Sequence, residues 1–291
     1  MDSSRVAVLM LVHQDPIQFH RSVDALAPFP VVVHCDVATP VGEYEAMQRA
    51  LRPDVSFIER SRTPWGAWSA VEAELDCLEA AVRSTSAQHF VMVSGSDYPL
   101  ASTEVISDAL ARYEGRSLVA MFPMPFANWG PDGGFQRLHY RYVVIGERPT
   151  RLPYRRKLPD GLRYAGASVS KILCREHAEA LLEVRRSRPD LVRFWRPSRS
   201  ADETFIATML ASFVITDPGD VVVASPWYLD WQGVGNNSPK WLDDSDWEAI
   251  VERGHDDTVG APLLFARKFS TTKSAGLLDR IDRELRAGNG S

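Results

Sequence analysis

Two adjacent acids in the C-terminal half of the sequence, Asp202 and Glu203, lie where a carboxylate could act on a substrate. They open a helix predicted over residues 201–212, directly after a loop rich in arginine, serine and proline. A carboxylate at the mouth of a cleft can serve as a general base that takes a proton from an acceptor hydroxyl. Acids at the start of a helix also complement the helix dipole without any further role. The pair alone leaves both interpretations open.

A second pair, Arg267 and Lys268, lies near the C-terminal end of the sequence inside an apolar frame. Leucine and phenylalanine flank the two cations in Leu264–Phe269 and would hold this segment against the core. Guanidinium and ammonium groups held in place are suited to binding a diphosphate. A solvated loop is the alternative, but such a loop rarely needs phenylalanine on both sides. The pattern therefore favours a diphosphate site.

Three polar clusters follow apolar runs that are typical of buried strands. They lie at residues 13–15, 34–36 and 94–97. In open parallel sheets, ligands bind beyond the carboxyl ends of the strands, so the three clusters are expected to converge on one crevice. Asp36, in the second cluster, suits hydrogen bonding to a ribose or a base edge. Its alternative role is that of a loop aspartate that caps the next turn.

The third cluster belongs to the segment Ser94–Leu100, which combines a glycine, two hydroxyl groups and an acid in one turn. Glycine permits backbone conformations that other residues resist. The simpler explanation is a tight turn that leads to a helix capped near Ser102 or Thr103. The segment is more elaborate than a cap requires, which favours a binding role for Ser94 and Asp97.

The sequence fingerprints of several other site types are missing or weak. The motifs GxGxxG, GxxxxGK[ST] and GxSxG do not occur, which removes the main support for dehydrogenase, P-loop and α/β-hydrolase functions. Asp244-Ser245-Asp246 spells a DxD motif, but no strand precedes it, and we interpret it as the acidic first turn of a helix. We interpret His13, Asp15, His34 and Asp36 as hydrogen-bonding loop residues in preference to a metal cluster.

The elements that must position these residues alternate between strands and helices. Continuous apolar runs predict strands at 5–13, 30–36, 55–59, 89–94, 117–125 and 221–224. Apolar residues at three- and four-residue steps predict helices at 65–82, 176–186, 201–212 and 277–285. Residues 126–164 are expected to be rich in loops. Buried strands that alternate with helices predict an α/β fold, with a mostly parallel sheet covered by helices on both faces.

The composition is that of an ordinary folded globular protein. Of the 291 residues, 45% are hydrophobic and 24% are charged. A net charge of −5 argues against a dedicated nucleic-acid binder, because phosphate contacts require a basic face. Three separate cysteines without a CxxC pair indicate a reducing compartment. No apolar run is long enough to cross a bilayer and the start does not resemble a signal peptide, so a cytoplasmic location is expected.

Taken in order, these motifs resemble those of the core-2/I-branching β-1,6-N-acetylglucosaminyltransferase and peptide O-xylosyltransferase family, in a bacterial-type form. The matching stretches run collinearly between residues 6 and 285. Each is weak alone, whereas six in the same order are specific. They are Val12–Pro16, Val33–Asp36, Trp65-Gly66 with Val71–Leu75, Ser94–Leu100, Asp202–Phe205 and Phe265–Phe269.

The resemblance implies a GT-A-like, Rossmann-like fold in a single domain over residues 1–291. Its nucleotide-binding part would cover about 1–125, and its acceptor and catalytic part about 126–291. The resemblance also implies an inverting transferase that uses a UDP-sugar, needs no metal and has Glu203 as its catalytic base. The residues assigned to the nucleotide-sugar are Val12, His13, Asp36, Ser94, Asp97, Lys240, Arg267 and Lys268. Those assigned to the acceptor are Trp231, Arg137 and Tyr140.

The sequence departs from the family at one sugar-contacting motif and leaves the substrates open. Where the family has Gly-Ser-x-Trp, this sequence has Gly166-Ala167-Ser168-Val169, so the tryptophan is missing. N-acetylglucosamine and xylose are the expected sugars, and the acceptor is expected to be a glycan or a lipid-linked glycan. The basic segment 148–163 would face this acceptor or the inner face of a membrane, or form a solvated loop. A catalytically silent nucleotide-sugar-binding protein and a metal phosphohydrolase are the alternative functions.

Overall fold

The computed structural model describes residues 5–145, 148–232, 238–254 and 261–287. Its strands are β1 Val6–Val12, β2 Val31–Cys35, β3 Val55–Phe57, β4 His89–Ser94, β5 Asp97–Pro99, β6 Ser117–Leu118, β7 Met121–Pro123, β8 Tyr140–Ile145, β9 Arg148–Arg155, β10 Ala165–Ala167, β11 Lys171–Cys174, β12 Val221–Val222, β13 Trp227–Leu229 and β14 Phe265–Arg267. Its α-helices are α1 Pro16–Ala25, α2 Val41–Gln48, α3 Trp68–Ser84, α4 Thr103–Ala111, α5 Gln136–His139, α6 Arg175–Ser187, α7 Pro189–Trp195, α8 Phe205–Met209, α9 Trp247–Gly254 and α10 Ala275–Ile281.

The described residues form a central sheet in the strand order β12-β6-β11-β4-β1-β2-β3. β1, β2, β3 and β4 run parallel to one another. β12 is also parallel to its neighbour β6, whereas β11 runs antiparallel to both β4 and β6. The predicted α/β class with a mostly parallel sheet is therefore confirmed.

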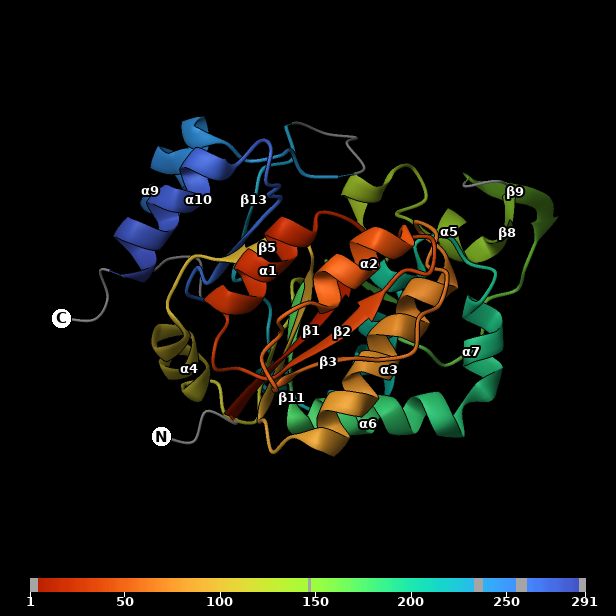
Figure 1. Cartoon of the computed structure of the whole chain (residues 1–291). Coiled ribbons are helices and arrows are strands. Elements are labelled where there is room, and N and C mark those ends of the chain that lie inside the picture. The colour runs from red at the N-terminus through yellow and green to blue at the C-terminus, as the bar shows by residue number, and fades with distance from the viewer. Residues whose placement is uncertain (1–4, 146–147, 233–237, 255–260, 288–291) are drawn as a thin grey trace.

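The buried core covers both faces of this sheet because side chains of a strand alternate between its two faces. In β1, Ala7 and Leu9 pack with residues of α3, α6 and α8. Val6, Val8 and Met10 pack on the opposite face with residues of α1 and α4. α3 and α6 lie against each other on their face of the sheet (Figure 1). Strands buried on both faces explain the unbroken apolar runs in the sequence.

Most predicted elements lie within a few residues of their observed positions. The first four strands are β1 to β4, and the predicted long helix is α3. The single strand expected over 117–125 is divided into β6 and β7, which pair with different partners. The prediction of loops over 126–164 was incomplete, because β8 and β9 form an antiparallel hairpin there. The antiparallel strand β11 was not predicted.

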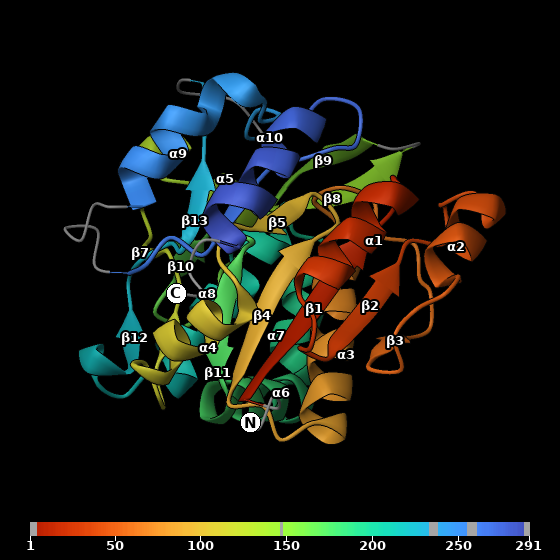
Figure 2. The same ribbon diagram turned by 60° about the vertical axis from the view of Figure 1, so that its left-hand side comes forward.

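The carboxyl ends of β1, β2 and β4 point toward the same side of the molecule (Figure 2). A small second sheet at this side, in the order β13-β14-β5, contains Arg267 and Asp97 opposite each other. A third buried cluster joins this sheet to α9 and α10. Within the described residues, no helix is both long and apolar enough to cross a membrane.

Candidate active site

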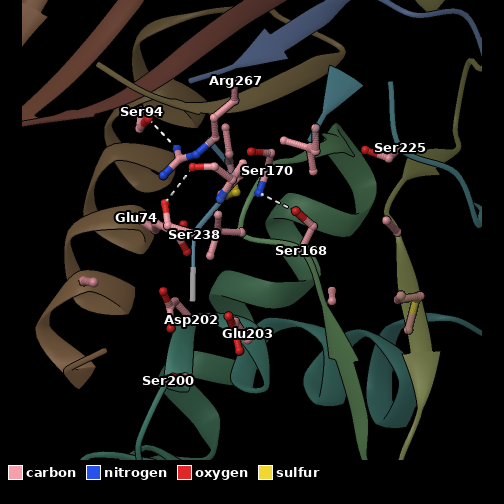
Figure 3. Close-up of a pocket in the computed structure, with 18 of the residues that line it drawn as sticks. Glu74, Ser94, Ser168, Ser170, Ser200, Asp202, Glu203, Ser225, Ser238 and Arg267 are labelled. Carbon is pink, nitrogen blue, oxygen red and sulfur yellow. Dashed lines mark hydrogen bonds between the residues drawn. The ribbon is translucent and has the colours of Figure 1, made fainter. Parts of the chain in front are cut away.

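A cavity of about 760 Å³ opens beside the carboxyl ends of β1 and β4. Aromatic rings make up much of its wall, from residues 65, 122, 126, 129 and 231. Figure 3 shows Arg267 and Ser94 toward one end of the pocket, Asp202 and Glu203 toward the other, and Glu74 between them. The pocket therefore places a cation and carboxylates from distant parts of the sequence around one volume large enough for a sugar nucleotide.

Glu203 reaches the pocket because two loops are joined by their backbones. Ser200 N–H donates to the carbonyl oxygen of Gly66 with an N···O distance of 2.9 Å. Gly66 has a φ of +69°, in the left-handed region that favours glycine. Ser200, with a φ of 48°, shares that region and leads into the short 3-10 turn Ala201–Glu203. The turn then enters α8, and this path fixes the direction of Glu203.

The carboxylate of Glu203 forms an ion pair with Arg137 Nη1. The guanidinium of Arg137 also lies over the ring of Trp129, 3.7 Å from the ring centroid. Burial raises the pKa of Glu203 above its ordinary value, and Arg137 opposes this effect. A carboxylate whose pKa is raised is a better proton acceptor near neutral pH. The surroundings of Glu203 thus suit a general base.

Arg267 is held at the other end of the pocket by Asp97. The two residues face each other across the β14–β5 pairing, and Arg267 Nη1 donates to Asp97 Oδ2 at 3.0 Å. Arg267 also donates to Ser94 Oγ. Asp97 is buried and accepts a further bond from Trp227 Nε1 at 2.8 Å. Asp97 does not line the pocket; it holds Arg267 and Ser94, which do.

Lys268 and Lys240 differ in their surroundings. Lys268 Nζ donates to the pocket-lining Ser238 at 3.1 Å and lies over the Trp241 ring at 4.1 Å. Burial, with Arg267 and Lys273 nearby, lowers the pKa of Lys268. Lys240 Nζ is paired with Asp246, 2.9 Å away, and lies 3.7 Å from Asp230. Lys268 does not line the pocket itself but contacts its wall at Ser238, whereas Lys240 is held by two acids away from it.

The other residues assigned to the nucleotide lie at the ends of β1 and β2. Val12 is buried beside Gly95, where an added Cβ would meet the valine side chain at 3.1 Å, and His13 is exposed. Asp36 accepts hydrogen bonds from Thr63 N–H at 2.8 Å, Thr63 Oγ1 at 2.6 Å and Ala38 N–H at 2.7 Å. Burial opposes the ionisation of Asp36, but these bonds outweigh it and lower the pKa. Asp36 thus joins its own loop to the loop that follows β3.

Of the three residues assigned to the acceptor, only one lines the pocket. Trp231 lines the pocket and is 44% exposed. Arg137 does not line the pocket but contacts it through Glu203 and Trp129. Tyr140 lies in β8, where the guanidinium of Arg151 covers its ring at 4.6 Å. Of the basic segment 148–163, residues 148–155 form β9 of the β8–β9 hairpin, and the rest follows it.

Glu74, which lines the pocket, and Lys171, which is buried behind it, were not predicted as site residues. Glu74 lines the cavity, and its Oε1 lies 3.5 Å from Nζ of the fully buried Lys171. A signal for Glu74 exists in the sequence, because it shares the apolar face of α3 with Val71 and Leu78 at helical spacing. A charged residue at such a core position indicates a buried partner. Lys171 had no such signal.

The candidate metal motifs have other structural roles. Asp243 caps the 3-10 turn Asp244–Asp246 by accepting from Ser245 N–H, and α9 follows directly, as the sequence predicted. Asp15 caps α1 and accepts from Thr271 N–H at 2.9 Å. Among the described residues, no three His, Cys, Asp or Glu side chains are grouped as ligands for a metal ion.

Comparison with known proteins adds a family to this geometry. A model of the Core-2/I-branching enzyme family matches residues 7–252. A β-1,3-galactosyl-O-glycosyl-glycoprotein β-1,6-N-acetylglucosaminyltransferase 3 from Ovis aries is 26% identical over 212 residues, which cover 70% of this chain and 46% of that enzyme. The Homo sapiens enzyme of the same name is 25% identical over 218 residues, with 70% and 47% covered. A similar enzyme from Bovine herpesvirus 4 (strain LVR140) is 26% identical over 212 residues, with 70% and 46% covered. The chain spans about half the length of these relatives.

Proposed function

The chain belongs to the Core-2/I-branching enzyme family, and from this premise we propose that it is an inverting glycosyltransferase with a UDP-sugar as donor and a glycan hydroxyl as acceptor. The observation that carries this proposal is that Glu203 and Arg267 face the same pocket from opposite ends. A base and a fixed cation on either side of a sugar are what a single displacement at the sugar's C1 requires.

In the proposed reaction, the acceptor hydroxyl oxygen forms a bond to C1 of the sugar while the bond from C1 to the diphosphate oxygen breaks. The hydroxyl proton passes to the carboxylate of Glu203. The bonding electron pair leaves with UDP, whose negative charge grows in the transition state. Attack on the face opposite the leaving group inverts the configuration at C1.

We assign the neutralisation of the leaving diphosphate to Arg267 and Lys268. Arg267 is fixed by Asp97, so its guanidinium needs little reorganisation when charge develops. Lys268 reaches the pocket wall at Ser238. Fixed cations can take the place of a divalent ion at a diphosphate, and on this basis we propose that the reaction needs no metal.

The transferred sugar and the acceptor are proposed from the relatives. Their names state that they transfer N-acetylglucosamine, and we propose this sugar for the chain, with xylose as the alternative. The acceptor would be a glycan or a lipid-linked glycan that enters past Trp231. In the β8–β9 hairpin, Ile145 and Tyr154 are 64% and 77% exposed. Contact of this hairpin with the cytoplasmic face of a membrane stays a prediction.

Replacing Glu203 with glutamine tests the proposed base. We expect Glu203→Gln to lower acceptor-dependent UDP release by about 10²- to 10⁴-fold, because proton transfer is lost. UDP binding should stay within about twofold of the wild type, since Arg267 and Lys268 are intact. The rate of UDP release from UDP-GlcNAc with a panel of aryl glycosides, and calorimetry with UDP, measure the two quantities.

A control separates a chemical role of Glu203 from a structural one. Glu183→Gln makes the same change at an exposed position of α6 and should leave both quantities unchanged. Loss of UDP binding and activity together in Glu203→Gln would point to a structural role instead. Wild-type protein that binds UDP but releases none with any acceptor would favour the silent binding protein.

A further inference from the structure

A buried charge cluster lies along the pocket wall, from the middle of the pocket to the end where Glu203 lies. Glu74, from α3, and Lys171, from β11, form an ion pair with side chains that are 10% and 0% exposed. Asp202 belongs to the same cluster. Its charge acts on Glu74, and the charge of Lys171 acts on Asp202. The carboxyl groups of Glu74 and Asp202 both border the cavity.

The polar atoms of this cluster are not satisfied by the described protein. Glu74 Oε2, Lys171 Nζ and Asp202 Oδ1 are buried and have no hydrogen-bond partner there. Buried polar groups are nearly always hydrogen-bonded, because an unpaired one loses the hydrogen bonds that it would make to water. Two of the three residues, Glu74 and Asp202, line the cavity, which indicates that a polar group from outside the chain completes the cluster. The reaction proposed above uses none of the three atoms.

The position of the cluster limits what this group can be. In Figure 3, Glu74 lies between Arg267 at one end and Asp202 and Glu203 at the other. The diphosphate would lie at Arg267 and the acceptor hydroxyl at Glu203, so the group between them is the transferred sugar. This placement rests on the proposed function.

We propose that Glu74 and Asp202, held by Lys171, form a subsite that binds hydroxyl groups of the transferred sugar. Carboxylates accept hydrogen bonds from hydroxyls, and bonds to charged groups are the stronger ones. With two carboxylates and a single ammonium, the subsite disfavours a sugar that carries a carboxylate, such as a uronic acid. It is a specificity site for neutral, polyhydroxylated sugars. Val169, at the position of the missing tryptophan, lines the same cavity.

The subsite is tested by comparing UDP with UDP-GlcNAc, because only the second ligand carries a sugar. The variant replaces both partners of the ion pair, Glu74→Leu with Lys171→Met, so that neither charge is left buried alone. We expect the ratio of the UDP-GlcNAc Kd to the UDP Kd to rise about tenfold or more, since bonds to charged groups are lost. The Kd of UDP should stay near that of the wild type, which also shows that the variant is folded.

A matched control changes the other end of the pocket. Arg267→Met should weaken UDP and UDP-GlcNAc alike and leave the ratio unchanged. Glu74→Gln, which keeps the size of the side chain, is the second variant if the double variant does not fold, and it should raise the ratio in the same direction. At least one of the 3-, 4- and 6-deoxy analogues of UDP-GlcNAc should bind the wild type about tenfold more weakly than UDP-GlcNAc, and the double variant no more weakly.

The outcomes distinguish this inference from the proposed function. Normal UDP binding with an unchanged Kd ratio in Glu74→Gln and in the double variant, or deoxy analogues that all bind like UDP-GlcNAc, would overturn the subsite and leave the transferase intact. A wild-type chain that does not bind UDP would overturn the transferase, and the subsite with it.

Discussion

Glu203 is subject to two opposed influences, burial and the charge of Arg137. Burial raises its pKa and Arg137 lowers it, with burial the larger. Arg137→Met removes the lowering influence, so the pKa of Glu203 should rise further. A base must be deprotonated to act, and the acid limb of kcat/KM should therefore move to higher pH, by about one pH unit.

The pH profile of kcat/KM for UDP release measures this shift. The readout is the pH at which the acid limb lies and not the maximal value of kcat/KM. Arg137 is also assigned to the acceptor, so its loss can lower that maximal value as well. Arg83→Met, the same change at an exposed position of α3, should leave the limb in place. An acid limb that stays fixed or moves to lower pH in Arg137→Met would show that Glu203 is not the titrating base.

Single residues of the site were predictable only where their neighbours in sequence gave a signal. Glu203 and Arg267 stood in distinctive local patterns, and both line the pocket. The buried position of Lys171 depends on its contact with Glu74, about a hundred residues earlier in the chain. Such contacts leave no local pattern, so composition and spacing could not indicate them.

At the scale of elements, the base is positioned by the junction of the loop before α3 with the loop before α8. The junction depends on Gly66, whose φ of +69° strains any residue with a Cβ. Gly66→Ala should lower the free energy of unfolding by about 1 kcal/mol. It should also lower kcat at least about fivefold, because a small displacement of Glu203 weakens proton transfer.

Gly115→Ala is the matched control for this prediction. Gly115 has a φ of +72° with no atom near its missing Cβ, and it follows α4. The Gly115→Ala variant should show the same decrease in the free energy of unfolding, measured by thermal or urea unfolding, and should keep the wild-type kcat. Equal kcat values for the two variants would contradict the role of the Gly66–Ser200 junction.

The strands that are buried on both faces of the sheet were predictable, because such burial requires an unbroken apolar run in the sequence. β1 and β4 are central and consist mostly of apolar residues, and both were found at their predicted positions. β11 begins with a lysine and spans only four residues, so it has no such run. Together, β8 and β9 are rich in arginine and have no long unbroken apolar run. They form a sheet because they pair with each other.

At the scale of the whole molecule, the site exists because the C-terminal segment returns to the sheet. β14 pairs with β5, about 170 residues earlier in the chain, and this pairing brings Arg267 to Ser94 and Asp97. Asp15, at the end of β1, holds the same segment through Thr271. The ends of β1, β2 and β4 lie side by side as expected, but of the three polar clusters only the one at 94–97 reaches the pocket, through Ser94. The sequence indicated the two cations, but not that β5 would be the strand beside them.

The rate of acceptor-dependent UDP release from UDP-GlcNAc, measured in the presence of EDTA, tests whether Arg267 and Lys268 neutralise the diphosphate in place of a metal ion. We expect the wild-type rate to be unchanged by EDTA, and the variant Arg267→Met with Lys268→Met to lose at least about 100-fold. A wild-type rate that EDTA abolishes and Mn²⁺ restores, with a double variant as fast as the wild type, would contradict this role of Arg267 and Lys268.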